Sequence, residues 1–566
     1  MNVYAHEIDK ALGREFLKSS RVELGMKHFD LYVDFIKTRI CEEPDNEGFK
    51  ERYNSCIKEY NDLLLPEARN AFNAGNWVKT MVICQKLLYN EADEPSIFKF
   101  LSFCYKNTNQ NDLRLDFIKK YTELVPDDVE NGKLLGEAYY EVDQKKYAEL
   151  ALGYIRTYLE TQTKDIEAWN FVGHIYASHL TKDLREIDTQ LNCFLKALEL
   201  DPNNLLTLHN IVQTYIRAKM NTKADEIYDK IIALNGKNWN NNDHFNYAAF
   251  KIRCGDFITG FKHYEERFNP EKTEDPALRG VYYPKMNRPK WDGSQSIKNS
   301  TLLVHFEQGL GDNIMFIRFV RYIQKFAKKV IAVVPTLVYE LFKESNLPFD
   351  IYPAEQSLDE LNFDYHIPLL SLPYVLKLTP YNIPDTKGYL KVTPERIKNY
   401  KDKYIVDDNT YKIGINFEGG ESGKEQKRDI DWKEIKRFTD IENVQVYCLN
   451  KHKDKKFFDE IDPNLNVICL GETFKSFADT AAAALNMDLV IATDSGVLNL
   501  VGALGVKTLM PLNFDYEYRW YNTESGRTVW YDNVKTFVNE CQDDWEATLE
   551  KLVAEVKRDM SEKLNK

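Results

Sequence analysis

The first half of the chain repeats itself at intervals of about 34 residues, and this internal period limits what the chain can fold into. Leu101 and Tyr105 lie on one face of a predicted helix, and Leu135 and Tyr139 take the equivalent places in the next unit. A unit of this length holds two helices and cannot bury its apolar face alone, so stacked units must build the core together. The period therefore predicts an α-solenoid over residues 61–268.

The clearest unit runs from Trp169 through Gly173 and Ala197 to Pro202. It resembles the tetratricopeptide repeat, a helix pair in which small residues let the two helices approach closely. The resemblance implies a concave surface that binds a protein or peptide. Two alternatives stay open, because such repeats also mediate self-association into a homo-oligomer or brace a neighbouring domain.

Composition excludes several classes of protein. The formal net charge of -13 argues against a nucleic-acid binder, which needs a basic footprint on the phosphate backbone. The nine cysteines form no CxxC pair and have no His partners at zinc spacing, so we expect reduced thiols and a cytoplasmic protein. The sequence contains neither a signal-like start nor an apolar run long enough for a membrane span.

The pattern of apolar residues changes after the repeats. A polar segment punctuated by prolines reads as a linker, and beyond it short apolar runs alternate with helical patterns. Such alternation is typical of parallel sheets covered by helices. The expected order is an N-terminal helical segment (1–60), the repeats (61–268), the linker (269–300), two α/β domains (301–398 and 410–540) and a C-terminal helix (541–566).

The first predicted strand of the α/β region, TLLVHF, leads into a glycine turn. Gly309 and Gly311 allow a sharp turn, and Asp312 stands where a helical pattern begins. A dinucleotide-binding fold requires a third glycine, but that position is Ile314, so this motif is not met. Because an acid beside the glycines would repel a pyrophosphate, Asp312 is a candidate for contacting a hydroxyl or a cation. Helix capping is the alternative.

A second turn follows the predicted strand at residues 489–492. Here Ser495 and Gly496 stand at the start of a helix, where backbone N–H groups can bind a phosphate. Both turns are expected at the carboxyl ends of parallel strands, so two crevices would face each other. One would hold a nucleotide and the other would place an acid at the acceptor.

Three segments carry a family resemblance: HFEQGLGDNIMFIRF, FDYHIPLLSLP and SFADTAAAALNMDLVIATDSGVLNLVGALG. Together they resemble bacterial tetratricopeptide-repeat glycosyltransferases related to glycosyltransferase family 9, the heptosyltransferase-like group. The resemblance implies the GT-B fold, in which two Rossmann-like domains enclose a cleft for a nucleotide-diphosphate sugar, and a mechanism without metal or cofactor. It also implies that the acceptor is a Ser or Thr hydroxyl of a protein docked on the repeats.

The same resemblance suggests roles for individual residues. Asp312 matches the acid proposed as general base, and Asp494, Ser495 and Gly496 match the step that holds the donor. Asn499 stands where the family has a His, which matters because Asn offers only a neutral hydrogen bond. Further cleft residues implied by the resemblance are Gln308, Phe417 (in place of a family Trp), Lys424, Lys427, Arg428, Glu517, Arg519 and Trp520.

The basic residues of that group could neutralise a leaving diphosphate, and a solvated loop is the alternative for Lys424, Lys427 and Arg428. The sequence thus predicts a metal-independent glycosyltransferase. Asn499 favours a competing hypothesis, a non-catalytic repeat scaffold with a decayed transferase domain. In a third, the acceptor is a lipopolysaccharide-type sugar, although such an acceptor does not need a long solenoid.

Overall fold

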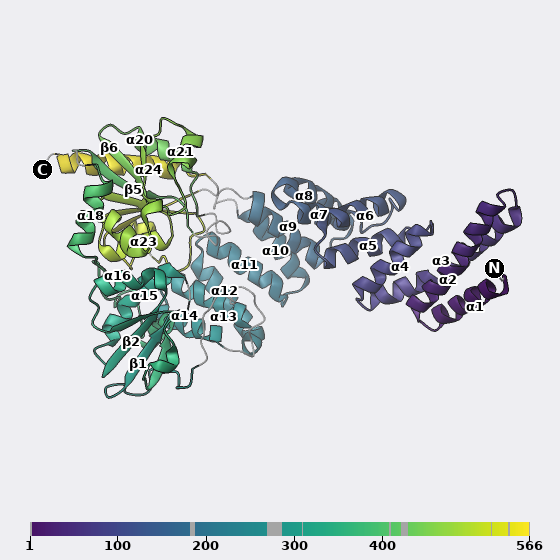
Figure 1. Cartoon of the computed structure of the whole chain (residues 1–566), viewed down its shortest axis with the longest axis horizontal. Coiled ribbons are helices and arrows are strands. Elements are labelled where there is room, and N and C mark those ends of the chain that lie inside the picture. The colour runs from purple at the N-terminus through teal and green to yellow at the C-terminus, as the bar shows by residue number, and fades with distance from the viewer. Residues whose placement is uncertain are drawn as a thin grey trace. The chain divides into compact units, whose positions relative to one another are not determined.

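A computed structural model describes residues 3–180, 187–268, 286–307, 309–406, 409–419, 428–521, 523–540 and 544–564 (Figure 1). The chain divides into two compact units, residues 1–181 with 186–214, and residues 182–185 with 215–566. Among the described residues, no helix combines the length and the apolar character needed to cross a bilayer.

The first unit is built of helices that pack in consecutive pairs joined by short loops, which is the expected arrangement of an α-solenoid. Its helices are α1 (Val3–Lys18), α2 (Val22–Glu42), α3 (Glu47–Asn73), α4 (Trp77–Tyr89), α5 (Ser96–Asn107), α6 (Asn111–Leu124), α7 (Asn131–Val142), α8 (Gln144–Thr161), α9 (Ile166–Ile175), a π-helical turn (Tyr176–Leu180), α10 (Asp188–Leu200) and α11 (Leu205–Arg217), whose last residues belong to the second unit.

Small residues let the paired helices touch, as the sequence predicted. A Cβ atom on Gly136 would lie 2.5 Å from a side-chain carbon of Ile155, and one on Gly173 would lie 2.5 Å from the ring of Phe194. Since real Cβ atoms do not approach so closely, larger residues would force these helices apart. The helical half is therefore a solenoid that resembles tetratricopeptide repeats.

The period also appears in polar contacts between neighbouring pairs. Lys99 on α5 contacts Asp128 at 3.1 Å, and Lys133 on α7 contacts Asp165 at 2.9 Å. The expected boundary at residue 60 falls inside α3, so the N-terminal segment and the repeats form one continuous stack. Apolar residues from α1 to α5 share a single core.

The second unit begins with helices and continues into two parallel sheets. Its first helices are α12 (Asn221–Asn235), α13 (Asn241–Arg253) and α14 (Phe257–Tyr264), followed by a 3₁₀ turn (Glu265–Phe268). The four-stranded sheet has the order β3-β2-β1-β4, with β1 (Thr301–His305), β2 (Lys329–Val334), β3 (Asp350–Pro353) and β4 (Tyr365–Pro368). The six-stranded sheet has the order β10-β9-β8-β5-β6-β7, with β5 (Tyr411–Asn416), β6 (Val444–Cys448), β7 (Val467–Cys469), β8 (Leu489–Ala492), β9 (Thr508–Leu512) and β10 (Val534–Val538).

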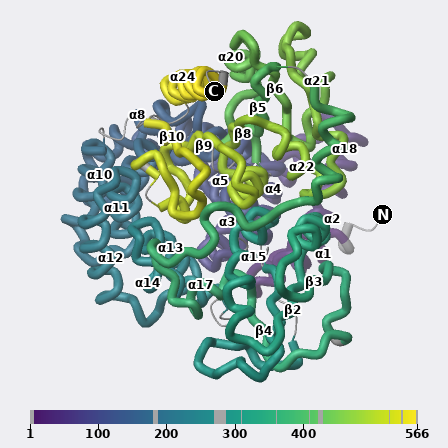
Figure 2. The backbone as a smooth tube through the Cα atoms, turned by 90° about the vertical axis from the view of Figure 1, so that its left-hand side faces the viewer, coloured from purple at the N-terminus to yellow at the C-terminus, as the bar shows by residue number. Residues whose placement is uncertain are grey.

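Pairing between neighbouring strands of both sheets is parallel, so the predicted parallel-sheet α/β region is confirmed. Helices α15, α16 and α23 lie between the two sheets in Figure 1, and α24 lies against β9 and β10 in Figure 2. The helices of this region are α15 (Leu310–Ile323), α16 (Thr336–Glu344), α17 (Leu372–Val375), α18 (Pro394–Tyr404), α20 (Lys436–Thr439), α21 (Lys455–Ile461), α22 (Phe477–Ala484), α23 (Gly496–Leu504) and α24 (Glu546–Leu564).

Two expected boundaries differ from the structure. Residue 398 lies inside α18, so the first α/β domain does not end there. The second half of the predicted linker is packed rather than free, because the Trp291 N–H donates to the carbonyl of His366 at 2.8 Å and extends the edge at β4. Residues 269–285 of that linker lie outside the described residues.

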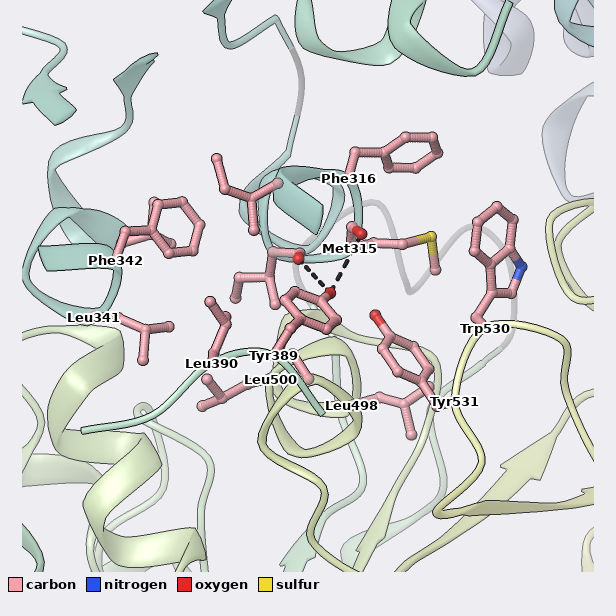
Figure 3. Close-up of a cluster of buried hydrophobic side chains, with 14 of the residues drawn as sticks. Met315, Phe316, Leu341, Phe342, Tyr389, Leu390, Leu498, Leu500, Trp530 and Tyr531 are labelled. Carbon is pink, nitrogen blue, oxygen red and sulfur yellow. Dashed lines mark hydrogen bonds between the residues drawn. The ribbon is translucent and has the colours of Figure 1, made fainter. Parts of the chain in front are cut away.

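A buried arginine fixes the start of α15 against the second sheet region. Arg318 donates to the Trp530 carbonyl at 2.7 Å and to the Tyr389 hydroxyl at 3.0 Å, and that hydroxyl donates to the carbonyl of Ile314 at 2.6 Å. Figure 3 shows Tyr389, Tyr531 and Trp530 gathered around this helix among apolar side chains. The glycine turn that precedes α15 is therefore held in a rigid frame.

Candidate functional site

A cavity of about 1150 Å³ lies in the second unit where the two sheet regions meet. The carboxyl ends of parallel strands open into it, which is the usual place for a ligand in such sheets. Lining residues include Asn242, Phe245, Tyr264, Gly309, Leu310, Gly311, Asp312, Asn416, Glu418, Arg428, Lys451, His452, Lys475, Ser476, Phe477, Asp494, Ser495, Gly496, Asn499, Asp515, Glu517, Tyr518, Arg519 and Trp520.

The two glycine turns touch each other in this cavity. A Cβ atom on Gly311 would lie 3.0 Å from Nδ2 of Asn499 and 3.3 Å from Cα of Gly496. Only glycine at position 311 allows this approach without displacing the second turn. The N-termini of α15 and α23 consequently lie side by side, and each contributes partial positive charge.

Asp312 is the third residue of α15, and its N-cap is Gly309, which has no side chain. Asp312 therefore does not occupy the N-cap position that the capping alternative required. Its carboxylate instead forms an ion pair with Nη1 of Arg519. Arg519 also donates from Nε and from its backbone N–H to the carboxylate of Glu517, at 2.8 Å each.

Burial shapes the electrostatics of this cluster. Burial raises the pKa of Glu517, and the charges of Asp494 and Asp312 add to the rise, while Arg519 opposes it. Burial alone would lower the pKa of Arg519, but the charges of Asp312 and Glu517 raise it well above its ordinary value. The guanidinium therefore stays charged and holds the two acids together.

The second turn carries an acid that is also paired with an arginine. Asp494 follows β8 and lies 3.3 Å from Nη1 of Arg428. Ser495 caps α23, since its Oγ accepts from the Leu498 N–H at 3.3 Å and donates to Oδ1 of Asn416 at 3.1 Å. The structure thus places the Ser495–Gly496 step at a helix start.

Asn499 is held by hydrogen bonds to residues on other parts of the second unit. Its Oδ1 accepts from the Tyr531 hydroxyl at 2.8 Å, and its Nδ2 donates to the Ser495 carbonyl at 3.2 Å. Its side chain borders the cavity, with the amide nitrogen beside Gly311.

The prediction that Phe417 lines the cleft is wrong. Phe417 is fully buried and packs 5.5 Å from the ring of Trp432, away from the cavity. Its neighbours Asn416 and Glu418 line the cavity instead, because successive side chains point to opposite faces of an extended chain. Gln308, Lys424 and Lys427 lie outside the described residues.

A buried ion pair just before the first glycine turn could not be predicted from any local sequence pattern. Arg267 donates from Nε and Nη2 to the two carboxylate oxygens of Glu307, at 2.8 and 2.9 Å. Both side chains are almost inaccessible to water, and Glu307 also accepts from the Leu370 N–H at 2.9 Å. This pair ties the end of the helical region to the strand–turn segment that leads to Asp312.

The last helical pair forms part of the cavity wall, although the sequence suggested that a linker separates the repeats from the α/β region. Asn242 and Phe245 on α13 and Tyr264 on α14 line the cavity. Phe245 meets the ring of Tyr518 edge-on at 5.7 Å, so this wall continues directly into the segment that carries Arg519. Neither contact follows from a local sequence pattern.

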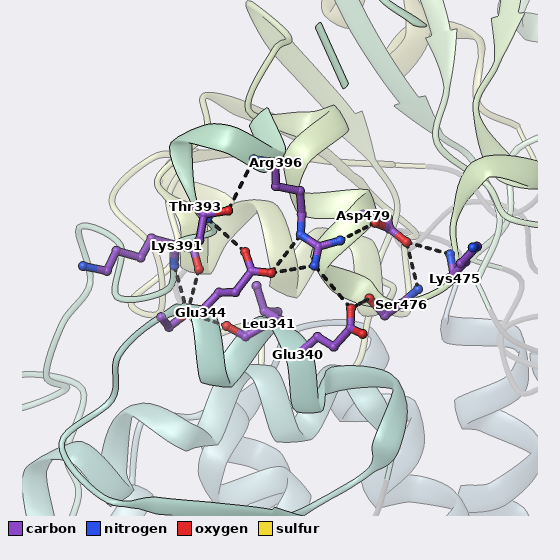
Figure 4. A network of polar contacts seen from close by, with 10 residues as sticks. Glu340, Leu341, Glu344, Lys391, Thr393, Arg396, Lys475, Ser476 and Asp479 are labelled. Atoms are coloured by element: carbon purple, nitrogen blue, oxygen red, sulfur yellow. Dashed lines mark hydrogen bonds and ion pairs between the residues drawn. The ribbon is translucent and has the colours of Figure 1, made fainter. Parts of the chain in front are cut away.

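A polar network joins the two sheet regions beside the cavity (Figure 4). Arg396 contacts Glu344 of α16 at 2.6 Å and Asp479 of α22 at 2.7 Å. Ser476, which precedes α22 and lines the cavity, donates to Glu340 at 3.0 Å. The network therefore couples the position of α22 to the four-stranded sheet region.

Within the described residues, no group of three or more His, Cys, Asp or Glu side chains could hold a metal ion. Two acid–arginine pairs lie among the charged side chains of the cavity, Asp494 with Arg428 and Asp312 with Arg519.

Comparisons with known proteins give a partial context. No family model matches the chain. Protein FlbA of Caulobacter vibrioides (strain ATCC 19089 / CIP 103742 / CB 15) is 22% identical over 477 residues, which cover 78% of this chain and 75% of FlbA.

Solved structures of MamA also match, among them MamA 41-end from Desulfovibrio magneticus RS-1 (16% identity, TM-score 0.28, 31% of this chain and 96% of that chain) and MamA AMB-1 (18% identity, TM-score 0.27, 31% and 92%). At these TM-scores the superpositions carry no argument, and the assignment of helical repeats rests on the helix pairs of this chain.

Proposed function

We propose that the chain is a glycosyltransferase that moves a sugar from a nucleotide-diphosphate sugar to a hydroxyl, with the GT-B arrangement of its two sheet regions. The single observation that carries this proposal is the contact between the two glycine turns. That contact sets an acid and two helix N-termini around one cavity. The cavity volume lies just above the usual range of about 300–1,000 Å³ for small-molecule sites.

The chemistry follows from the placement of these groups. The diphosphate of the donor would lie at the N-terminus of α23, where Gly496 and Val497 present backbone N–H groups and the helix dipole favours negative charge. Asp312 would accept the proton of the acceptor hydroxyl while the hydroxyl oxygen bonds to the anomeric carbon. The bond from that carbon to the phosphate oxygen breaks, and the nucleoside diphosphate leaves with the electron pair.

Arg428 and Arg519 supply positive charge for the leaving group, which is the usual electrostatic contribution in such a site. The repeats would bind a protein acceptor, because stacked helix pairs present extended surfaces. Since Asn242 and Phe245 of α13 reach the cavity wall, an acceptor bound on this last helical pair would meet the site.

One observation favours the second candidate, a binding scaffold without catalysis. Asn499 is engaged by Tyr531 and Ser495 and carries no charge with which to neutralise a diphosphate. In that case the cavity would bind a nucleotide sugar but would not cleave it.

A two-step experiment separates the candidates. A thermal-shift screen of the full chain against UDP-, GDP-, ADP- and CDP-linked sugars in EDTA should raise the melting temperature with at least one of them. The sugar nucleotide that binds is then incubated with the protein, with water as the acceptor hydroxyl, and release of the free nucleoside diphosphate is followed. Binding with release supports the transferase, binding without release supports the scaffold, and no binding to any of them contradicts both.

A further inference from the structure

The Arg519–Asp312 ion pair joins two groups that sugar transfer would require separately. A carboxylate oxygen that already accepts from a guanidinium has less capacity to accept from an incoming hydroxyl. A guanidinium that already holds a carboxylate has fewer donors for a phosphate. This inference rests on the proposed function and concerns the order of events at the same site.

The two edges of the Arg519 guanidinium have different surroundings. Its Nε and its backbone N–H both donate to Glu517 at 2.8 Å, and its carbonyl accepts from Nε1 of Trp530 at 2.6 Å. These contacts anchor the backbone and the inner edge of the side chain. The contact to Asp312 uses Nη1 at the outer edge, which can change partner by a small rotation while the Glu517 contacts remain.

A diphosphate at the second turn would come close to this outer edge. Gly311 and Gly496 are in contact, so the start of α23 lies beside the turn that carries Asp312. Arg519 borders the same cavity, and a planar guanidinium matches the oxygen atoms of a phosphate well.

We propose that Arg519 has two successive partners: it holds Asp312 until a nucleoside diphosphate group binds, and it then transfers its outer edge to that group. The exchange releases the Asp312 carboxylate, which can then accept the proton of the acceptor hydroxyl. Donor binding therefore switches on the base, and an acceptor that arrives first meets an acid that is still paired.

A thermodynamic consequence follows, because Asp312 and the diphosphate compete for Arg519. Removal of the Asp312 charge should strengthen diphosphate binding, and the gain should depend on Arg519. A general effect of charge must be separated from this competition. Asp515 offers a matched control, since it borders the same cavity but pairs with Arg253 at 3.4 Å.

The test is calorimetry of the full chain with UDP, GDP, ADP and CDP in EDTA, on the parent and on D312N, D515N, R519K and D312N/R519K. With the diphosphate that binds best, D312N should tighten binding by about tenfold, several times more than D515N. In the R519K background the same Asp312 change should tighten binding by less than about twofold, because lysine cannot bridge the same partners.

Equal gains in D312N and D515N would overturn the inference, as would the same D312N gain in both backgrounds. If R519K fails to fold, as judged by circular dichroism, the comparison of D312N with D515N still decides. A parent protein that binds none of the four diphosphates refutes the proposed function together with this inference. A parent that binds a diphosphate with unchanged affinity after D312N refutes only the inference.

Discussion

The buried pair of Arg267 and Glu307 gives the sharpest prediction about stability. Replacing Glu307 by Gln leaves a buried guanidinium without its bidentate partner, and breaking such a pair typically costs about 3–5 kcal/mol. Because Arg267 keeps its 2.9 Å contact with Glu265, we expect the lower end of that range. The loss arises in the second unit, where the pair joins the 3₁₀ turn after α14 to the turn before α15.

The expected size of the melting shift follows from the size of that unit. With about 2.1 cal/mol/K of unfolding entropy per residue and roughly 350 residues, a loss of about 3 kcal/mol lowers the melting temperature of the second unit by about 4 °C. Differential scanning calorimetry of the full chain measures this shift, and the transition of the first unit should stay in place.

Asp459→Asn is the control, because Asp459 forms an exposed ion pair with Lys455 on α21. Exposed pairs of this kind contribute under about 1 kcal/mol. If Glu307→Gln melts within 1 °C of the Asp459 variant, which would correspond to less than about 1 kcal/mol, the pair does not stabilise the unit as the geometry indicates.

Three further predictions concern acid stability, the contact between the turns, and the junction between the sheets. Burial lowers the pKa of His305 to about 3, so between pH 6.5 and 3 the imidazole binds a proton in the unfolded state but stays neutral in the folded state. The free energy of unfolding should therefore fall as the pH drops below about 6.5, by up to about 1.4 kcal/mol per pH unit for this group. In urea unfolding from pH 7 to 4.5, His305→Gln should make this free energy depend less on pH, and an unchanged pH dependence would contradict the prediction. Gly311→Ala should lower the free energy of unfolding by about 1–3 kcal/mol and weaken the nucleotide binding measured by calorimetry, because the added methyl group meets Asn499 and Gly496. No change in either measurement would show that the turns are not in contact. Arg396→Gln should lower the melting temperature and speed hydrogen exchange in α22, since it removes the contacts to Glu344 and Asp479, and unchanged exchange there would refute the proposed coupling.

Local patterns were sufficient to predict the helical solenoid and the parallel-sheet α/β region. The period of the repeats predicted helix pairs, and Gly136 and Gly173 allow the close packing that this period implies. Alternating strands and helices predicted parallel sheets, since such connections leave few topologies. The strands β3 and β10 were not predicted, because neither DIYP nor VKTFV contains a continuous apolar run.

The candidate site was less accessible from sequence. The glycine turns could be recognised because strand, glycines and helix follow one another locally. The partners of their acids could not, since Asp312 and Arg519 are 207 residues apart in the chain and only the fold brings them together. The same holds for Arg267 and Glu307, and for Phe417, whose burial depends on which face of the chain meets the core.

The most direct test of the account is the effect of Asp312→Asn on cleavage of the nucleotide sugar that binds the parent protein. Release of the nucleoside diphosphate is measured with donor at saturation and water as the acceptor hydroxyl, and Asp459→Asn serves as the control outside the cavity. If Asp312 is the general base, the Asn variant should fold normally and bind the donor at least as tightly as the parent, but turn over about 10² or more times slower. Turnover within a few-fold of the parent, under conditions in which the chemical step limits the rate, would contradict the catalytic role of Asp312.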